Sequence, residues 1–187
     1  MPRQLRTGVD EQILDSAAAL FARHGFEQTS LKALADAVGL SKAGLLHHFP
    51  SKEALFEAAW DHSRVLSSHV AEQVRPLPAG PARERKALEL LTDIALDRPG
   101  LVALLFRSMT APGEDPQQAQ DELLLNEMFV VDPQQELERA IRIVGALSAM
   151  AVLTLLANQE GDKTTWRPLI LRTCFDALGH RDAPGHH

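Results

Sequence analysis

Residues 30–53 read SLKALADAVGLSKAGLLHHFPSKE, and this stretch contains two short helical patterns separated by a glycine. In the first pattern, apolar residues recur at i, i+3, i+4 and i+7, which places them on one face of a helix. These residues are Leu31, Leu34, Ala35 and Val38. Gly39 then stands where a helix C-terminus favours a left-handed residue, and Leu40 follows as the apolar residue expected to pack against the end of the helix. The pattern predicts a helix that ends in a tight turn.

Three serines mark the starts of helices in this stretch. Ser30 precedes the first pattern, Ser41 precedes KAGLLHH, and Ser51 precedes a third pattern that begins with KEALF. A serine hydroxyl at an N-cap accepts a hydrogen bond from one of the first N–H groups of its helix. Two short helices joined by a turn that contains glycine form a helix-turn-helix, and the second helix of such a unit lies in the major groove of DNA. We therefore expect this stretch to bind DNA.

Residues 29–56, TSLKALADAVGLSKAGLLHHFPSKEALF, resemble the DNA-binding signature of the TetR/AcrR transcriptional repressors. The preceding ILDSAAALF, followed by Gly25 and Phe26, is similar to the opening of the same family, so the resemblance covers roughly residues 9–60. The chain departs from the family at Leu46, where the family usually has a tyrosine that touches a backbone phosphate.

The resemblance implies a set of DNA contacts in and around the two helices. The expected set is Thr29, Ser30, Leu31, Lys32, Lys42, Ala43, Gly44, Leu46, His47, His48 and Lys52. The small side chains of Ala43 and Gly44 allow the helix to approach base edges, and Lys42 can donate to guanine O6 or N7. The alternative is that these positions only tolerate small and polar residues.

Three positions in this set have competing interpretations. Lys52 stands at a helix N-terminus, where its charge opposes the helix dipole; a phosphate bound there would explain the placement, and a role in the helix start alone is the alternative. Leu46 either contacts a thymine methyl or turns inward while His47 or His48 takes over the phosphate. A ring of His48 that packs against Phe49 is a further alternative.

The net charge of −6 is distributed unevenly along the chain. Residues 1–52 carry six basic and five acidic side chains, a sum of +1. By subtraction from totals of 19 and 25, the other residues carry 13 basic and 20 acidic side chains, a sum of −7. Exposed charges farther apart than a Debye length, about 8 Å at physiological salt, are largely screened. The acidic remainder therefore does not prevent DNA binding, and it discourages non-specific adhesion.

The composition is that of a globular protein. Apolar residues make up 45% of the 187 residues and charged residues 24%. No uncharged apolar segment approaches 18 residues with flanks suited to crossing a bilayer, so no membrane partner is expected. The single cysteine, Cys174, excludes an internal disulfide and a multi-cysteine zinc site, and it fits a reducing, cytoplasmic location.

The helical patterns predict an all-α fold of about nine helices, three of them in an N-terminal head. We expect a helix-turn-helix domain at 1–52, an effector-binding and dimerisation domain at 53–179, and a flexible tail at 180–187. Asp132-Pro133 is a strong start signal for a long helix that ends near Gln159. Thr164 or Thr165 is expected to cap the last helix.

The part of the chain after the head contains candidates for an effector site and a dimer interface. Large apolar residues and polar residues that interrupt apolar faces could line a cavity and orient a ligand: Trp60, Phe106, Arg107, Met128, Met150, Thr154 and Asn158. The resemblance implies that the last two long helices pair with those of a second copy. The expected interface residues are Leu137, Ile141, Val144, Leu147, Trp166, Ile170, Thr173 and Ala177.

These observations favour a homodimeric, ligand-responsive regulator that binds a palindromic double-stranded operator, most simply a repressor released by a small molecule. The alternative is a helix-turn-helix regulator without such an effector, controlled by a protein or constitutive. An all-α enzyme is a remote alternative, because the chain contains no H-E-x-x-H, G-x-S-x-G or phosphate-loop motif. We expect no catalytic residue, no cofactor and no metal site.

Overall fold

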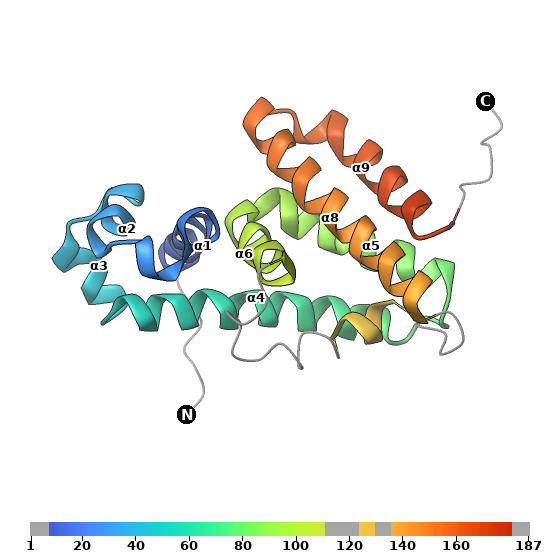
Figure 1. The fold of residues 1–187 in the computed structure, drawn as a ribbon, viewed down its shortest axis with the longest axis horizontal. Helices are drawn as coiled ribbons and strands as arrows, with labels where there is room; N and C mark the ends of the chain where they lie inside the picture. Colours follow the sequence, from blue (N-terminus) through green and yellow to red (C-terminus); the bar gives the residue numbers. More distant parts are fainter. Residues whose placement is uncertain (1–7, 111–123, 130–135, 181–187) are drawn as a thin grey trace. The chain divides into compact units, whose positions relative to one another are not determined.

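The structure, a computed structural model, describes residues 8–110, 124–129 and 136–180. The regular elements of these ranges are helical, which confirms the all-α prediction (Figure 1). They are α1 (Gly8–Gln28), α2 (Leu31–Ala37), α3 (Lys42–His48), α4 (Lys52–Val74), α5 (Pro81–Asp97), α6 (Pro99–Thr110), a segment at 124–128, α8 (Glu136–Glu160) and α9 (Lys163–Ala177). The predicted start of the long helix at Asp132-Pro133 lies outside the described residues.

The chain divides into two compact units. The first, here called the head, contains described residues 8–63 and 100–110. The second, here called the body, contains described residues 64–99, 124–129 and 136–180. The head is therefore larger than the expected 1–52, because it includes the first part of α4 and the helix α6.

The core of the head is formed by α1 and the helices that follow it. The buried side chains are Ile13, Leu14, Ala17, Ala18, Phe21, Leu34, Ala35, Leu45, Phe49 and Leu55. Beside them, the ring of Phe56 lies 5.0 Å from those of Phe21 and Phe26 and 6.2 Å from that of Trp60, measured between centroids. Aromatic pairs at such distances favour edge-to-face and tilted arrangements. This cluster fixes the start of α4 against α1.

Three features hold α6 against α1 within the head. A Cβ atom on Gly100 would lie 1.9 Å from the carbonyl oxygen of Asp15, so only glycine permits this approach. The Oδ1 atom of Asp15 accepts a hydrogen bond of 3.0 Å from the backbone N–H of Leu101 in the first turn of α6. Farther along α6, the guanidinium of Arg107 donates to the carbonyl oxygen of Ala22 at 3.3 Å.

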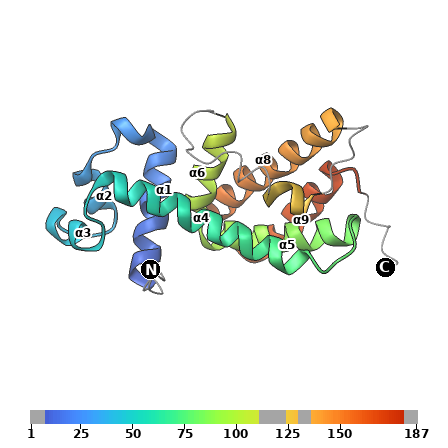
Figure 2. The same cartoon turned by 90° about the horizontal axis from the view of Figure 1, so that it is seen from below.

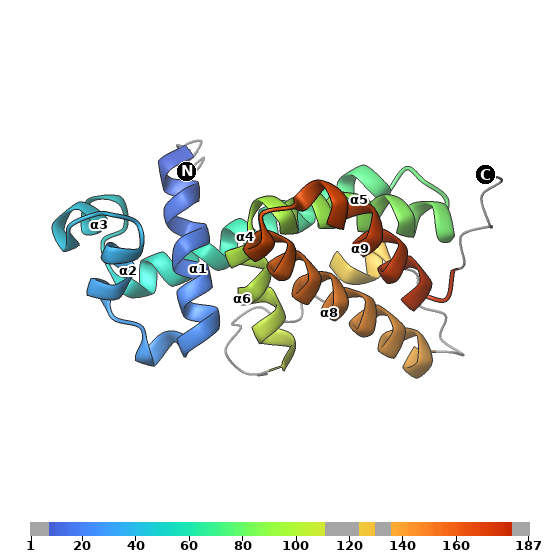
Figure 3. The ribbon, with the colours of Figure 1, turned by 90° about the horizontal axis from the view of Figure 1, so that it is seen from above.

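The core of the body is formed mainly by α5, α8 and α9, and α8 and α9 run side by side (Figures 1 and 3). Its buried residues include Leu88, Ile143, Ala146, Met150 and Ile170. Cys174 is fully buried among them, and burial raises the pKa of its thiol to about 12. The thiol therefore stays protonated at neutral pH and packs as a small apolar group.

Helix α8 satisfies the length and hydropathy criteria for a membrane span, over Leu137–Glu160. One face of α8 packs against α5 and α9 in the core of the body, as Ile143, Ala146 and Ala157 show. The core helix of a soluble protein passes the same test of length and composition, so one such helix does not by itself indicate a membrane span.

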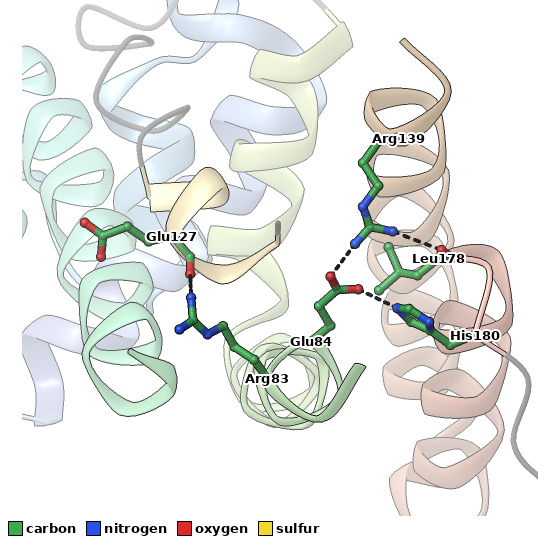
Figure 4. Close-up of polar contacts among 6 residues, drawn as sticks. All are labelled: Arg83, Glu84, Glu127, Arg139, Leu178 and His180. Atoms are coloured by element: carbon green, nitrogen blue, oxygen red, sulfur yellow. Dashed lines mark hydrogen bonds and ion pairs between the residues drawn. The ribbon is translucent and has the colours of Figure 1, made fainter. Parts of the chain in front are cut away.

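A buried carboxylate joins the three main helices of the body (Figure 4). The side chain of Glu84 on α5 is 3% exposed, and its two oxygens contact different partners. Oε1 lies 2.5 Å from Arg139 on α8, and Oε2 lies 2.7 Å from Nε2 of His180, just after α9. Arg139 also donates to the carbonyl oxygen of Leu178 at 2.9 Å. A buried charge needs such partners, since an unpaired one is costly.

The position of His180 corrects one prediction, because we expected the flexible tail to begin at this residue. Gly179, at φ 92°, ends α9 in a left-handed turn, and the N–H of His180 returns to the carbonyl of Phe175 at 3.2 Å. These are the features of a Schellman motif. The turn directs His180 toward Glu84 and places its ring 4.8 Å from that of Phe175. The remaining tail, 181–187, lies outside the described residues.

The start of α9 corrects a second prediction. Asp162, and not Thr164 or Thr165, is the N-cap residue, and its carboxylate accepts a 3.0 Å hydrogen bond from the N–H of Thr165. That backbone hydrogen bond holds the pKa of Asp162 below its ordinary value. An aspartate one residue after Gly161 provides the acceptor that the first turn needs.

We predict that Arg139→Ala lowers the free energy of unfolding by about 3–5 kcal/mol, because it leaves the Glu84 carboxylate buried without its guanidinium partner. Arg142→Ala on the same helix is the matched control. Its ion pair with Glu138 has side chains 42% and 65% exposed, so a change below about 1 kcal/mol is expected. Denaturant titration of both variants measures the difference, and equal effects would contradict the role of the buried carboxylate.

Candidate nucleic-acid interface

Three serine caps start the helices of the helix-turn-helix and of α4, as the sequence predicted. The Oγ atoms of Ser30, Ser41 and Ser51 accept hydrogen bonds of 3.1, 3.0 and 3.1 Å from the N–H groups of Ala33, Gly44 and Ala54. Each cap satisfies one of the N–H groups that a first helical turn leaves without an intrahelical acceptor.

The turn between α2 and α3 has the predicted left-handed glycine. Gly39 has φ 69°, and its N–H donates to the carbonyl of Asp36 at 3.2 Å. The N–H of Leu40 donates to the carbonyl of Ala35 at 3.0 Å. This pair of hydrogen bonds is a Schellman motif. The turn brings Ser41 to the start of α3, and Figures 1 and 2 show α2 and α3 as adjacent short helices in the head.

Helix α3 presents one buried and one exposed face. Leu45 is 1% exposed and belongs to the core of the head, as expected for a residue that points inward. Lys42, Ala43 and His47 are exposed, and Gly44 is partly exposed. The side chains expected to meet base edges are therefore on the accessible side of the helix. In α2, Lys32 is exposed and Leu31 is half-buried.

Thr29 makes its contact inside the head. The residue is 3% exposed, and its hydroxyl donates to the carbonyl of Gly25 at 2.7 Å. A hydroxyl has one hydrogen, so the side chain of Thr29 has no hydrogen left to donate to a phosphate. Of the two residues expected before α2, Ser30 is the exposed one.

Lys52 is also engaged within the head. Its ammonium donates to the carbonyl of Phe26 at 2.9 Å and lies 4.1 Å from the centroid of the Phe26 ring. These contacts explain a lysine at the start of α4, because carbonyl and ring offset the unfavourable interaction with the helix dipole. An ammonium has three hydrogens, so a phosphate contact is compatible with this position.

His48 is paired with a residue that sequence reasoning missed. Its Nδ1 atom lies 2.8 Å from Oδ1 of Asp10 in the first turn of α1. The sequence carries no local signal for this pair, because the residues are 38 positions apart. The ring of His47 lies 5.9 Å from that of His48 and stays exposed. Leu46 is half-buried.

The structure divides the expected effector-site residues between the two units. Trp60, Phe106 and Arg107 belong to the head, whereas the other four belong to the body. Met128 and Met150 are buried in the hydrophobic core of the body. Thr154 donates to the carbonyl of Met150 at 2.8 Å, and Asn158 donates to that of Thr154 at 2.9 Å, so both polar groups bond to their own helix.

Most of the expected interface residues of α8 and α9 are accessible in the single chain. Leu137, Ile141 and Val144 are 76%, 63% and 48% exposed. Thr173 is exposed, and Leu147, Trp166 and Ala177 are partly exposed. Ile170 differs, because it is 1% exposed and packs in the core, which leaves almost no surface for a partner.

Three exposed apolar residues on the same two helices were missed: Val152, Leu156 and Leu169. Val152 and Leu156 continue the helical spacing of Ile141 and Val144, which is the signal that could have identified them. We use the term apolar stripe for Leu137, Ile141, Val144, Val152, Leu156 and Leu169.

Comparison with known proteins supports the same interpretation of the N-terminal part. Residues 13–59 match the family described as bacterial regulatory proteins, tetR family. The transcriptional regulatory protein RaaS of Mycobacterium tuberculosis is 36% identical over 105 residues, which cover 55% of this chain and 46% of that protein. The repressor KstR2 of Rhodococcus jostii is 40% identical over 52 residues, which cover 28% of this chain and 26% of that protein. The match thus spans less than half of each of these relatives.

Solved structures extend the similarity over the whole fold. A TetR-like transcriptional regulator from Rhodococcus sp. RHA1 is similar with a TM-score of 0.60 and 25% identity, covering 96% of this chain and all of that chain. The TetR-family regulator PfmR from Thermus thermophilus has a TM-score of 0.57 and 21% identity, covering 97% of this chain and all of that one. The similarity to PfmR concerns the fold alone.

We predict that Lys52→Ala lowers the free energy of unfolding by about 1–3 kcal/mol, because it removes a charged hydrogen bond and a cation–π contact. Lys86→Ala is the control, since the ammonium of Lys86 lies 3.7 Å from Glu89 on the exposed surface of the body. Thermal or denaturant unfolding measures the effect. If Lys52→Ala lowers the free energy of unfolding no more than Lys86→Ala does, the contacts of Lys52 with Phe26 do not hold α4 in place.

Proposed function

This chain belongs to the TetR family of bacterial regulatory proteins, and we propose that it is a transcriptional regulator that binds operator DNA as a homodimer. The observation that carries the proposal is the exposed face of α3, where Lys42, Ala43 and His47 stand opposite the buried Leu45. Small residues and a lysine on the accessible side of a second helix suit the major groove. The relatives named above are regulators, which argues against an enzyme.

The homodimer is supported by the apolar stripe of the body. Monomeric proteins rarely expose large contiguous apolar patches, and such patches mark interaction sites. A second copy of α8 and α9 would cover the stripe with the same residues, as a two-fold interface requires. Two heads related by a two-fold axis bind two half-sites, so the operator we propose is palindromic.

We further propose that a small molecule controls DNA binding. The body forms a compact unit of its own, and the chain passes from head to body within α4. Such an arrangement allows a ligand of the body to change the spacing of two heads and thereby release the operator. The alternative is control by another protein or constitutive binding. With DNA as its partner, we place the protein in the cytoplasm.

Transcription measured in a cell-free system tests whether the protein represses or activates transcription. The template carries the duplex that the wild-type protein enriches from a random-sequence library, placed at a promoter. Less transcript with the protein than without it supports a repressor, and more transcript identifies an activator. A protein that enriches no duplex contradicts the proposed function as a whole.

We predict that Lys42→Ala relaxes the preference at one symmetric pair of base positions, because it removes a donor to guanine, at a cost of about 1–3 kcal/mol per lost bidentate contact. Repeated selection with the variant, with fluorescence anisotropy on single-base variants of the duplex, measures the change. An equal loss for every sequence would instead identify Lys42 as a phosphate ligand.

We predict that Val152→Asp converts the protein from dimer to monomer at micromolar concentration and weakens operator binding, because it places a charge in the apolar stripe. Val65→Asp is the matched control: Val65 on α4 is 50% exposed and Val152 is 46% exposed, but only Val152 lies in the stripe. Sedimentation velocity gives the mass of each variant. A dimer that survives Val152→Asp, or is lost equally in Val65→Asp, would contradict the interface.

A further inference from the structure

The contact between Asp10 and His48 determines which nitrogen of the imidazole can face DNA. A carboxylate only accepts hydrogen bonds, so the 2.8 Å contact with Oδ1 requires that Nδ1 carries the hydrogen. In a neutral imidazole, the other nitrogen, Nε2, is then an acceptor. Phosphate oxygens are acceptors too, so a neutral His48 held in this way cannot donate to a phosphate through Nε2.

Protonation of Nε2 changes His48 from an acceptor into a donor. An imidazolium has a donor at each nitrogen, so it can hold the Asp10 carboxylate at Nδ1 and a phosphate oxygen at Nε2 at the same time. The pair remains accessible, since the side chains of His48 and Asp10 are 29% and 26% exposed. His48 also ends α3, the helix with the exposed DNA-facing side, which brings its ring to the edge of that surface.

We propose that Asp10 is a positioning residue for DNA binding. It accepts the Nδ1 hydrogen of His48, so that His48 binds a backbone phosphate as an imidazolium through Nε2. The inference rests on the proposed function. It assigns to His48, rather than to His47, the phosphate contact that Leu46 cannot make in place of the family's tyrosine.

Other titratable groups lie close in sequence to the pair or at the start of α4. Glu11 follows Asp10 in the first turn of α1. On α3, His47 has its ring 5.9 Å from that of His48. At the start of α4, Lys52 is held by the Phe26 carbonyl and is followed by Glu53, whose backbone hydrogen bond lowers its pKa. Lysine and carboxylate side chains ordinarily keep their charges between about pH 6 and 8, so titration in that range reports on histidine and on the α-amino group, which the His48 variants distinguish.

The effect of removing Asp10 has opposite signs in the two possible accounts. If Asp10 only favours the first turn of α1 through the helix dipole, Asp10→Asn removes a negative charge near the DNA and strengthens binding. If Asp10 positions His48, the same change weakens binding despite the more favourable net charge. Asp36→Asn is the matched control, because Asp36 is an exposed carboxylate on α2 of the same head.

The test measures affinity by fluorescence anisotropy, at fixed salt between about pH 6 and 8, with the duplex that the wild-type protein enriches from a random library. Wild type is expected to bind more tightly at lower pH. Asp10→Asn is expected to weaken binding about fivefold to tenfold and to flatten this dependence. His48→Ala should do the same, and the double variant should bind no worse than His48→Ala alone.

A conservative substitution of His48 distinguishes a positioning role of Asp10 from an effect on folding. His48→Gln places an amide donor where Nε2 lies and needs no proton. It is expected to bind with a flat pH profile and to be insensitive to Asp10→Asn, whereas His47→Ala should keep that sensitivity. If Asp10→Asn behaves like Asp36→Asn, or if His48→Gln retains the wild-type pH dependence, the proposal is wrong. Wild-type protein that enriches no duplex would instead overturn the proposed function.

Discussion

The direction of α3 depends on the left-handed conformation of Gly39. Any other residue at φ 69° is strained by about 1 kcal/mol or more. A Cβ atom there would meet nothing within 4 Å, so the constraint comes from the backbone alone. The turn brings Leu40 and Ser41 to the start of α3 and thereby decides which side of α3 is buried. Burial of Leu45 then exposes Lys42 and His47 together, so the candidate interface follows from one backbone conformation.

Sequence reasoning succeeded where the cause of a structure lies within a few residues. The caps at Ser30 and Ser41 and the glycine turn are local, because donor and acceptor are three to five positions apart. It did not find the partners of His48 and Glu84, which are 38 and, for His180, 96 positions away. Such pairs depend on how helices pack. The local sequence around a charged residue on a helix face does not indicate which distant residue it contacts. Lys52 shows the same limit, since its ring and carbonyl contacts come from Phe26.

Helix α8 illustrates a second limit, because it has two apolar faces with different roles. Ile143, Ala146 and Met150 are buried in the body, whereas Leu137 and Ile141 are exposed. Periodicity identifies apolar positions, but it does not say which of two adjacent apolar faces meets the chain's own core. The neighbouring residues Leu169 and Ile170 show how fine the distinction is, since the first is 48% and the second 1% exposed. The packing of α9 against both α8 and α5 decides between them.

The contacts within the head also give a physical reason for the dimer that we propose as the DNA-binding form. The side chains of residues 1–52 sum to a charge of only +1, and the structure shows that Lys52 is held by Phe26 and that His48 faces a carboxylate. Non-specific affinity for DNA comes mainly from cations that displace counterions, so one head of this kind binds weakly. Linking two heads makes the second contact intramolecular, and affinity rises without any new cation. Because that gain is lost when the two heads do not match two half-sites, the proposed dimer would make specificity depend on the interface that the apolar stripe forms.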